Sequence, residues 1–127
     1  LDNKMLLSDF GFVIKGSADA GSCVGTLYYI APEVLFGKCY GKSADIWSLG
    51  VILYELVVGK TPFENEDQRK TAESIGAANF EMPSSISPLL RNLIARILVL
   101  NVDSRPSADE ILEDPWITLQ TKNILNI

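Results

Sequence analysis

The sequence predicts a mainly α-helical domain in which shorter helices surround a buried central helix, with a residual short strand near the N-terminus. Three observations lead to this prediction. Residues 43–58 form a run in which apolar side chains cover nearly the whole circumference of a helix. Ser87-Pro88 supplies an N-cap followed by proline at the first helical position. Ser107 and Glu110 have the spacing of a capping box.

The first residues predict a turn and a short strand. The chain begins at Leu1 rather than at a methionine, and the turn-forming residues 2–4 lead into an apolar strand from Met5 to Ser8. A strand needs a partner that satisfies its backbone hydrogen bonds. We therefore expect the partner strand to lie immediately before Leu1, in residues that this sequence lacks.

A long loop is predicted over residues 13–28. It is rich in glycine, serine and threonine, and it shows little hydrophobic periodicity. Loops longer than about a dozen residues inside a compact domain are usually functional. A short helical turn is expected to follow this loop, from Ala31 to Leu35.

The central helix is predicted from Ser43 to Val58. Ser43 is a suitable N-cap, and Gly59 lies just beyond the end, where glycine accepts the left-handed backbone that often terminates a helix. A helix that is apolar all round in a soluble protein is expected to be buried in the middle of its domain. The Thr-Pro-Phe sequence at residues 61–63 ends it.

Further helices are expected in the second half of the chain. Residues 66–78 predict a weaker, polar surface helix, and Ser87 begins a helix that extends to about Leu100. The capping box that starts at Ser107 predicts another. The residues after Trp116 give no comparable signal. The apolar face of the helix after Ser87 consists of Leu89, Leu90, Leu93, Ile94, Ile97 and Leu98.

Composition and charge argue against several functions. The chain has 127 residues, of which 47% are hydrophobic and 21% charged, as expected for one ordinary globular domain. The formal net charge is −5 and no basic stripe interleaved with aromatic residues is present, so no nucleic-acid partner is expected. Histidine is absent, which excludes Ser-His-Asp chemistry, histidine acid–base catalysis and histidine metal ligation within this chain.

The expected location is intracellular. The most apolar run, Leu49 to Val58, is well short of the roughly 20 residues that a membrane span needs, and it contains Glu55. No membrane partner is therefore expected. Cys23 and Cys39 do not make a disulfide framework or a metal site, and two reduced thiols indicate a reducing compartment. We expect the cytoplasm, with the nucleus as the alternative.

Two motifs lie on either side of the long loop. They are Asp9-Phe10-Gly11 and Ala31-Pro32-Glu33. In this order and at this spacing they resemble the D-F-G and A-P-E motifs that delimit the activation segment of the eukaryotic protein kinase family. The activation segment implied by the resemblance runs over residues 9–33.

The resemblance extends over essentially the whole chain, from Leu1 to Trp116. Residues 45–50 resemble the family's D-x-W-S-x-G at the start of its central helix, and the stretch that begins at Arg105 resembles its last helix and exit. The implied fold is a partial kinase C-terminal lobe over residues 1–127. Its helical subdomain would occupy residues 43–117.

The resemblance implies roles for the first motif. Phosphoryl transfer depends on positioning and on neutralising charge on the nucleotide phosphates. Asp9 is therefore the candidate Mg²⁺ ligand. Phe10 would pack so as to position Asp9, and Gly11 would permit the backbone turn. Without the resemblance, an aspartate after a strand could simply cap a turn.

Substrate contacts are implied at two positions. Thr26 lies in a stretch that resembles the family's G-T-x-x-Y substrate-docking sequence, and it favours serine/threonine specificity. As an alternative, its hydroxyl only forms a turn. Glu55 occupies the helix position at which basophilic kinases bind an arginine of the substrate. A carboxylate on a buried helix needs a partner, and an internal ion pair is the equally weighted alternative.

One regulatory residue is implied within the long loop. Ser22 lies four residues before Thr26, where many members of the family carry an activating phosphate, and Ser17 is the competing position. A phosphate there adds about −1.5 to −2 charges and can order a loop by pairing with arginine. An upstream activating kinase would then be a partner. The alternative is a flexible polar loop without modification.

Two structural roles are implied by the resemblance. Glu33 and Arg105 would form a buried ion pair that ties the activation segment to the lower helices. Asp45 would brace the backbone of the catalytic loop, which this sequence does not contain. Neither role is catalytic.

The motifs that are absent limit what the chain can do alone. It contains no Gly-rich loop, no V-A-I-K lysine and no H-R-D-L-x-x-x-N catalytic loop, and hence no catalytic base. The resemblance implies a parent enzyme that transfers the γ-phosphate of ATP, with Mg²⁺, to serine or threonine of protein substrates. The fragment itself is expected to be inactive. The alternative is a non-catalytic pseudokinase or a truncated scaffold that serves as an interaction module.

The subfamily is indicated only by short stretches. Residues 9–12 and 25–33 look most like the calcium/calmodulin-dependent, calcium-dependent and polo-like groups of serine/threonine kinases.

Overall fold

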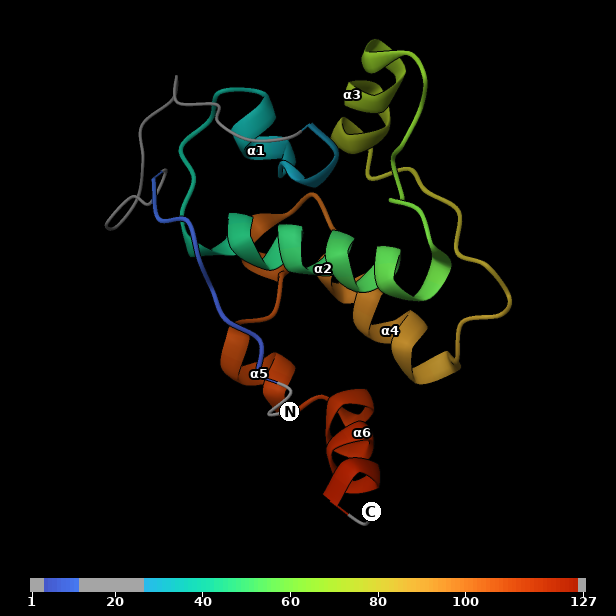
Figure 1. The fold of residues 1–127 in the computed structure, drawn as a ribbon. Coiled ribbons are helices and arrows are strands. Elements are labelled where there is room, and N and C mark those ends of the chain that lie inside the picture. Colours follow the sequence, from blue (N-terminus) through green and yellow to red (C-terminus); the bar gives the residue numbers. More distant parts are fainter. Residues whose placement is uncertain (1–3, 12–26, 126–127) are drawn as a thin grey trace.

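The structure is a computed structural model that describes residues 4–11 and 27–125. In chain order its elements are η1 (Leu27–Tyr29), α1 (Pro32–Leu35), α2 (Lys42–Val58), α3 (Gln68–Gly76), α4 (Pro88–Ile97), η2 (Val102–Ser104), α5 (Ala108–Leu112) and α6 (Pro115–Leu125), where η is a 3-10 helix. α2 crosses the middle of the molecule, with α1 and α3 on one side and α5 and α6 on the other (Figure 1). The predicted mainly helical fold is confirmed.

The end of α2 and the starts of α4 and α5 lie where the sequence predicted them. Gly59 ends α2 with a left-handed backbone, φ 86°, and Ser87 caps α4 with its hydroxyl. The capping box is present: the Glu110 amide donates to the Ser107 hydroxyl at 3.2 Å, and the Ser107 amide donates to the Glu110 carboxylate at 2.7 Å. This backbone bond from Ser107 holds the pKa of Glu110 below its usual value, because it stabilises the ionised carboxylate.

The start of α2 differs from the prediction. Gly41 occupies the N-cap position and provides no side-chain cap, so the assignment of Ser43 as the N-cap is wrong. Ser43 lies inside the first turn, and its hydroxyl donates to the backbone carbonyl of Val102 at 3.2 Å. Asp45 is the acidic residue of this turn, where a negative charge suits the positive end of the helix dipole.

The short strand expected at Met5 to Ser8 is not formed. Residues 4–11 have no strand pairing in the described part of the chain, and their side chains are exposed. The physical reason is the lack of a partner strand among the described residues. An extended segment without a neighbouring strand has no hydrogen-bond ladder to join.

Two helices differ in extent from the prediction, and a third was not predicted. α3 begins later than expected, at Gln68, after Asp67 has capped it by accepting from the backbone of Arg69. α4 ends at Ile97 rather than near Leu100. α6 was not predicted at all. It begins at Pro115.

The core lies between α2 and α4. Trp47, Val51 and Tyr54 of α2 are buried, as are Ile94 and Ile97 of α4. The two helices approach closely at Gly50, where any larger residue would place its Cβ in collision with the side chain of Ile97. Trp47 also stacks on Phe63, with ring centroids 5.4 Å apart. α2 is therefore the element on which the rest of the domain is assembled.

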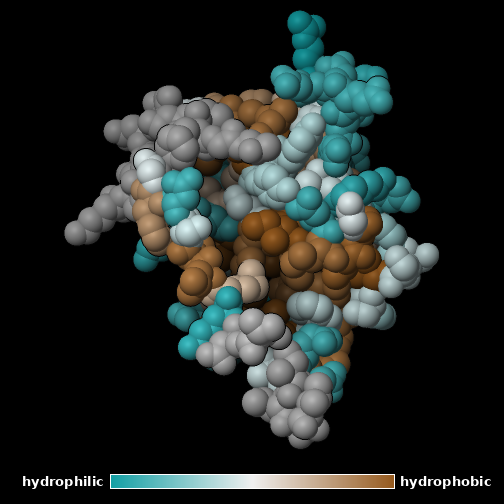
Figure 2. Space-filling model, in the orientation of Figure 1, coloured by the Kyte–Doolittle hydropathy of each residue, from teal (hydrophilic) through white to brown (hydrophobic). Residues whose placement is uncertain are grey.

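One face of α2 is bare, so the expectation that this helix is buried on every side is wrong. Leu49, Ile52 and Val57 are partly exposed, and Leu56 is 75% exposed. Figure 2 shows hydrophobic side chains gathered over the middle of the molecule, where α2 lies. An apolar circumference shows that a helix can be buried on all sides, but the neighbours that would cover this face are not among the described residues.

We expect the 127-residue chain to self-associate through this face, since contiguous exposed apolar surface favours association. Light scattering should give a mass above the 13.9 kDa of one chain. Leu56→Glu should reduce that mass toward the monomer. Leu112→Glu is the matched control, because Leu112 is also apolar and exposed but lies on α5. A monomeric chain with a sharp cooperative melt would contradict the expectation.

Candidate functional site

The A-P-E motif is anchored to the second half of the chain by the predicted Glu33–Arg105 ion pair. Arg105 Nη1 lies 2.7 Å from Glu33 Oε1, and Arg105 Nη2 lies 2.8 Å from Glu33 Oε2. Both residues are buried. Arg105 also donates to the backbone carbonyls of Val99 and Ser43, each at 3.0 Å. The pairing that the resemblance implied is therefore present.

The geometry explains how these charges are tolerated in the interior. Two parallel bonds join the planar guanidinium to the carboxylate, an arrangement that is both strong and directional. The carbonyls of Val99 and Ser43 use further N–H groups of Arg105, and its guanidinium lies over the ring of Trp47, 5.0 Å from the centroid. The desolvation of both charges is thus offset by bonds from four of the five N–H groups of the guanidinium and by the contact with the Trp47 ring.

A second contact joins the segment before the A-P-E motif to α2. The hydroxyl of Tyr29, in η1, donates to Glu55 Oε2 at 2.7 Å. This bond raises the pKa of Tyr29, and burial and the charges of Glu55 and Glu64 raise it further. Tyr29 therefore stays protonated at neutral pH and remains a donor. Sequence reasoning missed this residue, because the sequence gives no sign of which acceptor a tyrosine hydroxyl will meet.

The structure bears on both interpretations of Glu55. Within the described residues the ion pairs are Glu33–Arg105 and Arg96–Asp114, so the internal ion pair considered for Glu55 is not found there. Glu55 is half-buried and accepts from Tyr29 through one carboxylate oxygen. Glu64 is a second carboxylate close to Tyr29, and Thr61 donates to it at 3.4 Å.

Ser48 holds the same segment at another point. Its hydroxyl lies 2.8 Å from the backbone carbonyl of Tyr29 and 3.3 Å from that of Ala44. η1 is thus fastened to α2 by one backbone and one side-chain contact of the same tyrosine. No periodicity or motif in the sequence assigns this contact to Ser48.

Asp9 has an unusual backbone conformation. Its φ is 62°, in the left-handed region, which aspartate tolerates better than most residues. The amide of Gly11 donates to Asp9 Oδ1 at 3.3 Å, and the carboxylate is exposed. Phe10 is 62% exposed, so the packing expected to position Asp9 is not made within the described residues. The reason is that residues 4–11 are exposed and join no helix or strand in the part of the chain that the structure describes.

Of the other predicted site residues, some are described by the structure and some are not. Ala31 and Pro32 are buried at the start of α1, with Ala31 in the N-cap position. Asp45 is exposed, and no bracing contact of its carboxylate is found in the described part of the chain. The remaining residues fall in the stretch 12–26, outside the residues that the structure describes: Thr26, Ser22 and Ser17.

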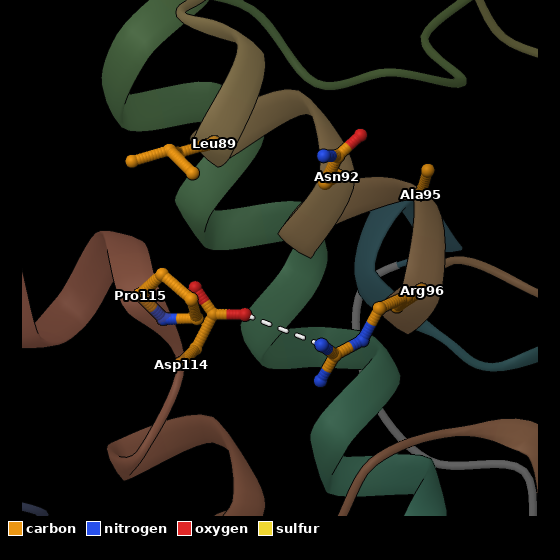
Figure 3. A pocket seen from close by; sticks show the side chains of 6 residues that line it. All are labelled: Leu89, Asn92, Ala95, Arg96, Asp114 and Pro115. Carbon is orange, nitrogen blue, oxygen red and sulfur yellow. Dashed lines mark ion pairs between the residues drawn. The ribbon is translucent and has the colours of Figure 1, made fainter.

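A hollow of about 420 Å³ lies between α4 and the start of α6, apart from all of these residues. Figure 3 shows its lining, with Arg96 of α4 facing Asp114 at 3.4 Å. Asp114 is buried and caps α6 by accepting from the Trp116 amide at 2.8 Å, whereas half of the Arg96 side chain is exposed. Through the ion pair and the cap, Asp114 links α4 to the start of α6 at this hollow. Its lining consists of Leu89, Asn92, Ala95, Arg96, Asp114 and Pro115.

The described residues contain neither a candidate membrane span nor a candidate metal cluster. Within 4–11 and 27–125, no helix combines the length and apolar character that a membrane span requires. In the same residues, no group of three or more His, Cys, Asp or Glu side chains is arranged as a metal site.

Comparison with known proteins gives a consistent result. A family model described as a protein kinase domain matches residues 1–117. Aurora/IPL1-related protein kinase 2 of Caenorhabditis elegans is 36% identical over 115 residues, which are 90% of this chain and 38% of that protein. Calcium/calmodulin-dependent protein kinase type II alpha chain of Drosophila melanogaster is 42% identical over 118 residues, which are 87% of this chain and 22% of that protein.

A plant protein shows the same similarity. The Zea mays protein named "Probable serine/threonine-protein kinase CCRP1" is 42% identical over 135 aligned residues, which cover 100% of this chain and 21% of that protein. This chain thus spans between 21% and 38% of the length of these three relatives.

Proposed function

Because the chain belongs to the protein kinase family, we propose that it forms part of a serine/threonine kinase that transfers the γ-phosphate of ATP to protein substrates. The observation that carries this proposal is the family match over residues 1–117, which includes both ends of the activation segment at residues 9–33. The helical subdomain at residues 43–117 would hold that segment in place through its contacts with residues 29 and 33. Catalysis, substrates and cofactors belong to the whole protein.

Specificity for serine and threonine is supported by two observations. Thr26 lies in the G-T-x-x-Y stretch, where we propose that it contacts the protein substrate. One relative is also named as a serine/threonine kinase. The similarity to a calcium/calmodulin-dependent kinase supports that group among the subfamilies considered.

Asp9 is the residue that we propose as a Mg²⁺ ligand. Mg²⁺ in nucleotide sites is commonly held by one or two carboxylates together with phosphate oxygens and water. The Asp9 carboxylate fits this need, because it is exposed and, among the described residues, only its Oδ1 accepts a bond, from the amide of Gly11. When bound, the ion neutralises charge on the nucleotide phosphates. This chain's own contribution is to hold the Asp9 carboxylate outward on a left-handed backbone.

Ser22 is proposed as the site at which an upstream kinase acts, with Ser17 as the competing position. The Glu33–Arg105 pair supports this proposal indirectly, since it fixes the downstream end of the loop to the domain. A phosphate would then act on a segment that is tethered at that end. Its arginine partner would lie in the H-R-D motif, which this sequence does not contain.

Glu55 is proposed to bind a cationic side chain of the substrate. Tyr29 engages one oxygen of its carboxylate, and no cation pairs with Glu55 in the described part of the chain. Glu64 adds a second negative charge close by. Two carboxylates on one surface favour arginine, whose guanidinium donates several hydrogen bonds at once.

Glu55→Gln in the full-length protein should reduce the preference for substrates with an arginine upstream of the phosphoacceptor. The amide keeps the acceptor for Tyr29 but removes the charge, and a bond to a charged group is worth ~1.5–3 kcal/mol, or roughly tenfold or more in kcat/KM. The measurement compares arginine- and alanine-containing peptides. Glu66→Gln, which removes the charge of another exposed carboxylate, is the control. An unchanged preference for arginine in Glu55→Gln would refute the assignment.

The second candidate is a non-catalytic interaction module, either a pseudokinase or a truncated scaffold. The exposed apolar face of α2 favours it, since such surfaces mark interaction sites in many proteins. The D-F-G motif at Asp9 favours the enzyme. The coding sequence that precedes this chain distinguishes the two, because only an enzyme requires the H-R-D motif and the ATP-binding lysine.

A further inference from the structure

Ser48 makes a contact that the proposed function does not yet explain. It lies on α2, half-buried, with its hydroxyl between the carbonyl of Tyr29 at 2.8 Å and that of Ala44 at 3.3 Å. A serine hydroxyl has a single proton and donates to one acceptor at a time. The shorter distance favours Tyr29, in a different element, over the carbonyl of its own helix.

Tyr29 is consequently held at both of its ends. Ser48 binds its backbone carbonyl, and Glu55 binds its hydroxyl at 2.7 Å. Ser48 and Glu55 are seven residues apart, which places them about two turns apart on the same face of α2. With its backbone and its hydroxyl both fixed to one face of a helix, the ring of Tyr29 has a set direction.

We propose that Ser48 is a positioning residue for substrate selection. By holding the backbone of Tyr29, it keeps the Tyr29 hydroxyl on one oxygen of Glu55 and so orients the carboxylate toward the cationic side chain of the substrate. Ser48 itself touches no substrate. This inference rests on the proposed role of Glu55, and it adds to that role the two residues that orient the carboxylate.

Ser43 provides a matched comparison on the same helix. It is also half-buried, and its hydroxyl also donates to a backbone carbonyl of another element, that of Val102 at 3.2 Å. Val102 belongs to η2, and nothing in this contact leads to Tyr29 or Glu55. A purely structural role for hydroxyls at such positions would make the two serines equivalent.

The test uses the full-length protein and two peptides that differ only in an arginine or an alanine upstream of the phosphoacceptor. The readout is the ratio of their kcat/KM values. Ser48→Ala should lower this ratio about three- to fivefold, the effect of losing one neutral hydrogen bond. Alanine is favourable inside a helix, so the variant should fold. Ser43→Ala should leave the ratio unchanged.

A double variant tests whether Ser48 acts through Tyr29. In a Tyr29→Phe background the hydroxyl bond to Glu55 is already lost, so adding Ser48→Ala should lower the ratio no further. A further fall would overturn the inference, as would an unchanged ratio in Ser48→Ala or an equal fall in Ser43→Ala. An unaltered protein without any arginine preference would overturn the role of Glu55 as well. A clear preference that Ser48→Ala does not affect would overturn only the role of Ser48.

Discussion

Replacing Arg105 or Glu33 with alanine is expected to lower the free energy of unfolding by about 3–5 kcal/mol, because each change leaves a buried charge without its partner. Arg105→Ala should be the more damaging of the two. It leaves the Glu33 carboxylate uncompensated, and it also removes the donors that serve the carbonyls of Val99 and Ser43. Glu33→Ala leaves a guanidinium that still has two carbonyl partners.

Denaturant titration of the 127-residue chain measures these effects. The double variant should lose less stability than the sum of the single variants, since the two side chains interact directly. Arg96→Ala is the control, because Arg96 forms a longer pair with Asp114 at 3.4 Å and its side chain is half exposed. It should cost less than either variant of the buried pair, since Arg96 is already half exposed to water and the buried Asp114 carboxylate keeps the Trp116 amide as a donor. Additive losses, or a loss for Arg96→Ala equal to that for Arg105→Ala, would show that the buried pair is not the main anchor.

Asp9→Asn in the full-length protein should reduce phosphoryl transfer on the order of 10²-fold or more, as expected for a group that stabilises charge in the transition state. Asparagine preserves the size of the side chain and the acceptor for the Gly11 amide, so folding should be unaffected. The measurement is the rate of γ-phosphate transfer to a protein substrate.

Two controls accompany this measurement. Asp103→Asn removes another exposed carboxylate, in η2, and should leave the rate unchanged. The 127-residue chain alone is expected to give no transfer, because its sequence contains neither the catalytic base motif nor the ATP-binding lysine. Full activity in Asp9→Asn would exclude Asp9 from catalysis. If the chain alone transfers phosphate and loses this activity on Asp9→Asn, the expectation that catalysis needs the absent base motif and lysine would be wrong.

The features predicted correctly from the sequence are those set by local interactions. The capping box at Ser107 and Glu110, the serine cap at Ser87 and the left-handed Gly59 each depend on groups within a few residues. The exception was Ser43, which has the composition of an N-cap. Gly41 took that position, because the first turn began at Lys42 and the Ser43 hydroxyl was used by Val102.

The features predicted wrongly depend on partners far away in the chain or outside it. The segment from Met5 to Ser8 has the composition of a strand, but it has no strand partner among the described residues. The apolar circumference of α2 predicted burial on all sides, yet Leu56 and its neighbours on that face are exposed. A hydrophobic pattern describes the surface that a helix can bury, whereas the actual burial depends on what packs against it.

The site was only partly accessible to sequence reasoning. Glu33 and Arg105 are 72 residues apart, and the resemblance to the kinase family, rather than spacing, predicted their pairing. Glu55 was identified by the same resemblance, but its bond to Tyr29, 26 residues away, was not. The contact of Ser48 with the Tyr29 carbonyl was missed as well. Hydrogen bonds between distant elements require the fold, because no local pattern encodes them.

Phosphoryl transfer by the full-length protein that contains this chain tests the central claim most directly. The protein is incubated with Mg²⁺ and γ-labelled ATP and a substrate peptide that offers serine, threonine and tyrosine, and the labelled residue is then identified. The account predicts label on serine or threonine, dependent on Asp9. Label on tyrosine would contradict the specificity assigned from Thr26. If the protein has both the catalytic base and the ATP-binding lysine but transfers no phosphate, the proposed kinase activity is contradicted. That result would favour the interaction module.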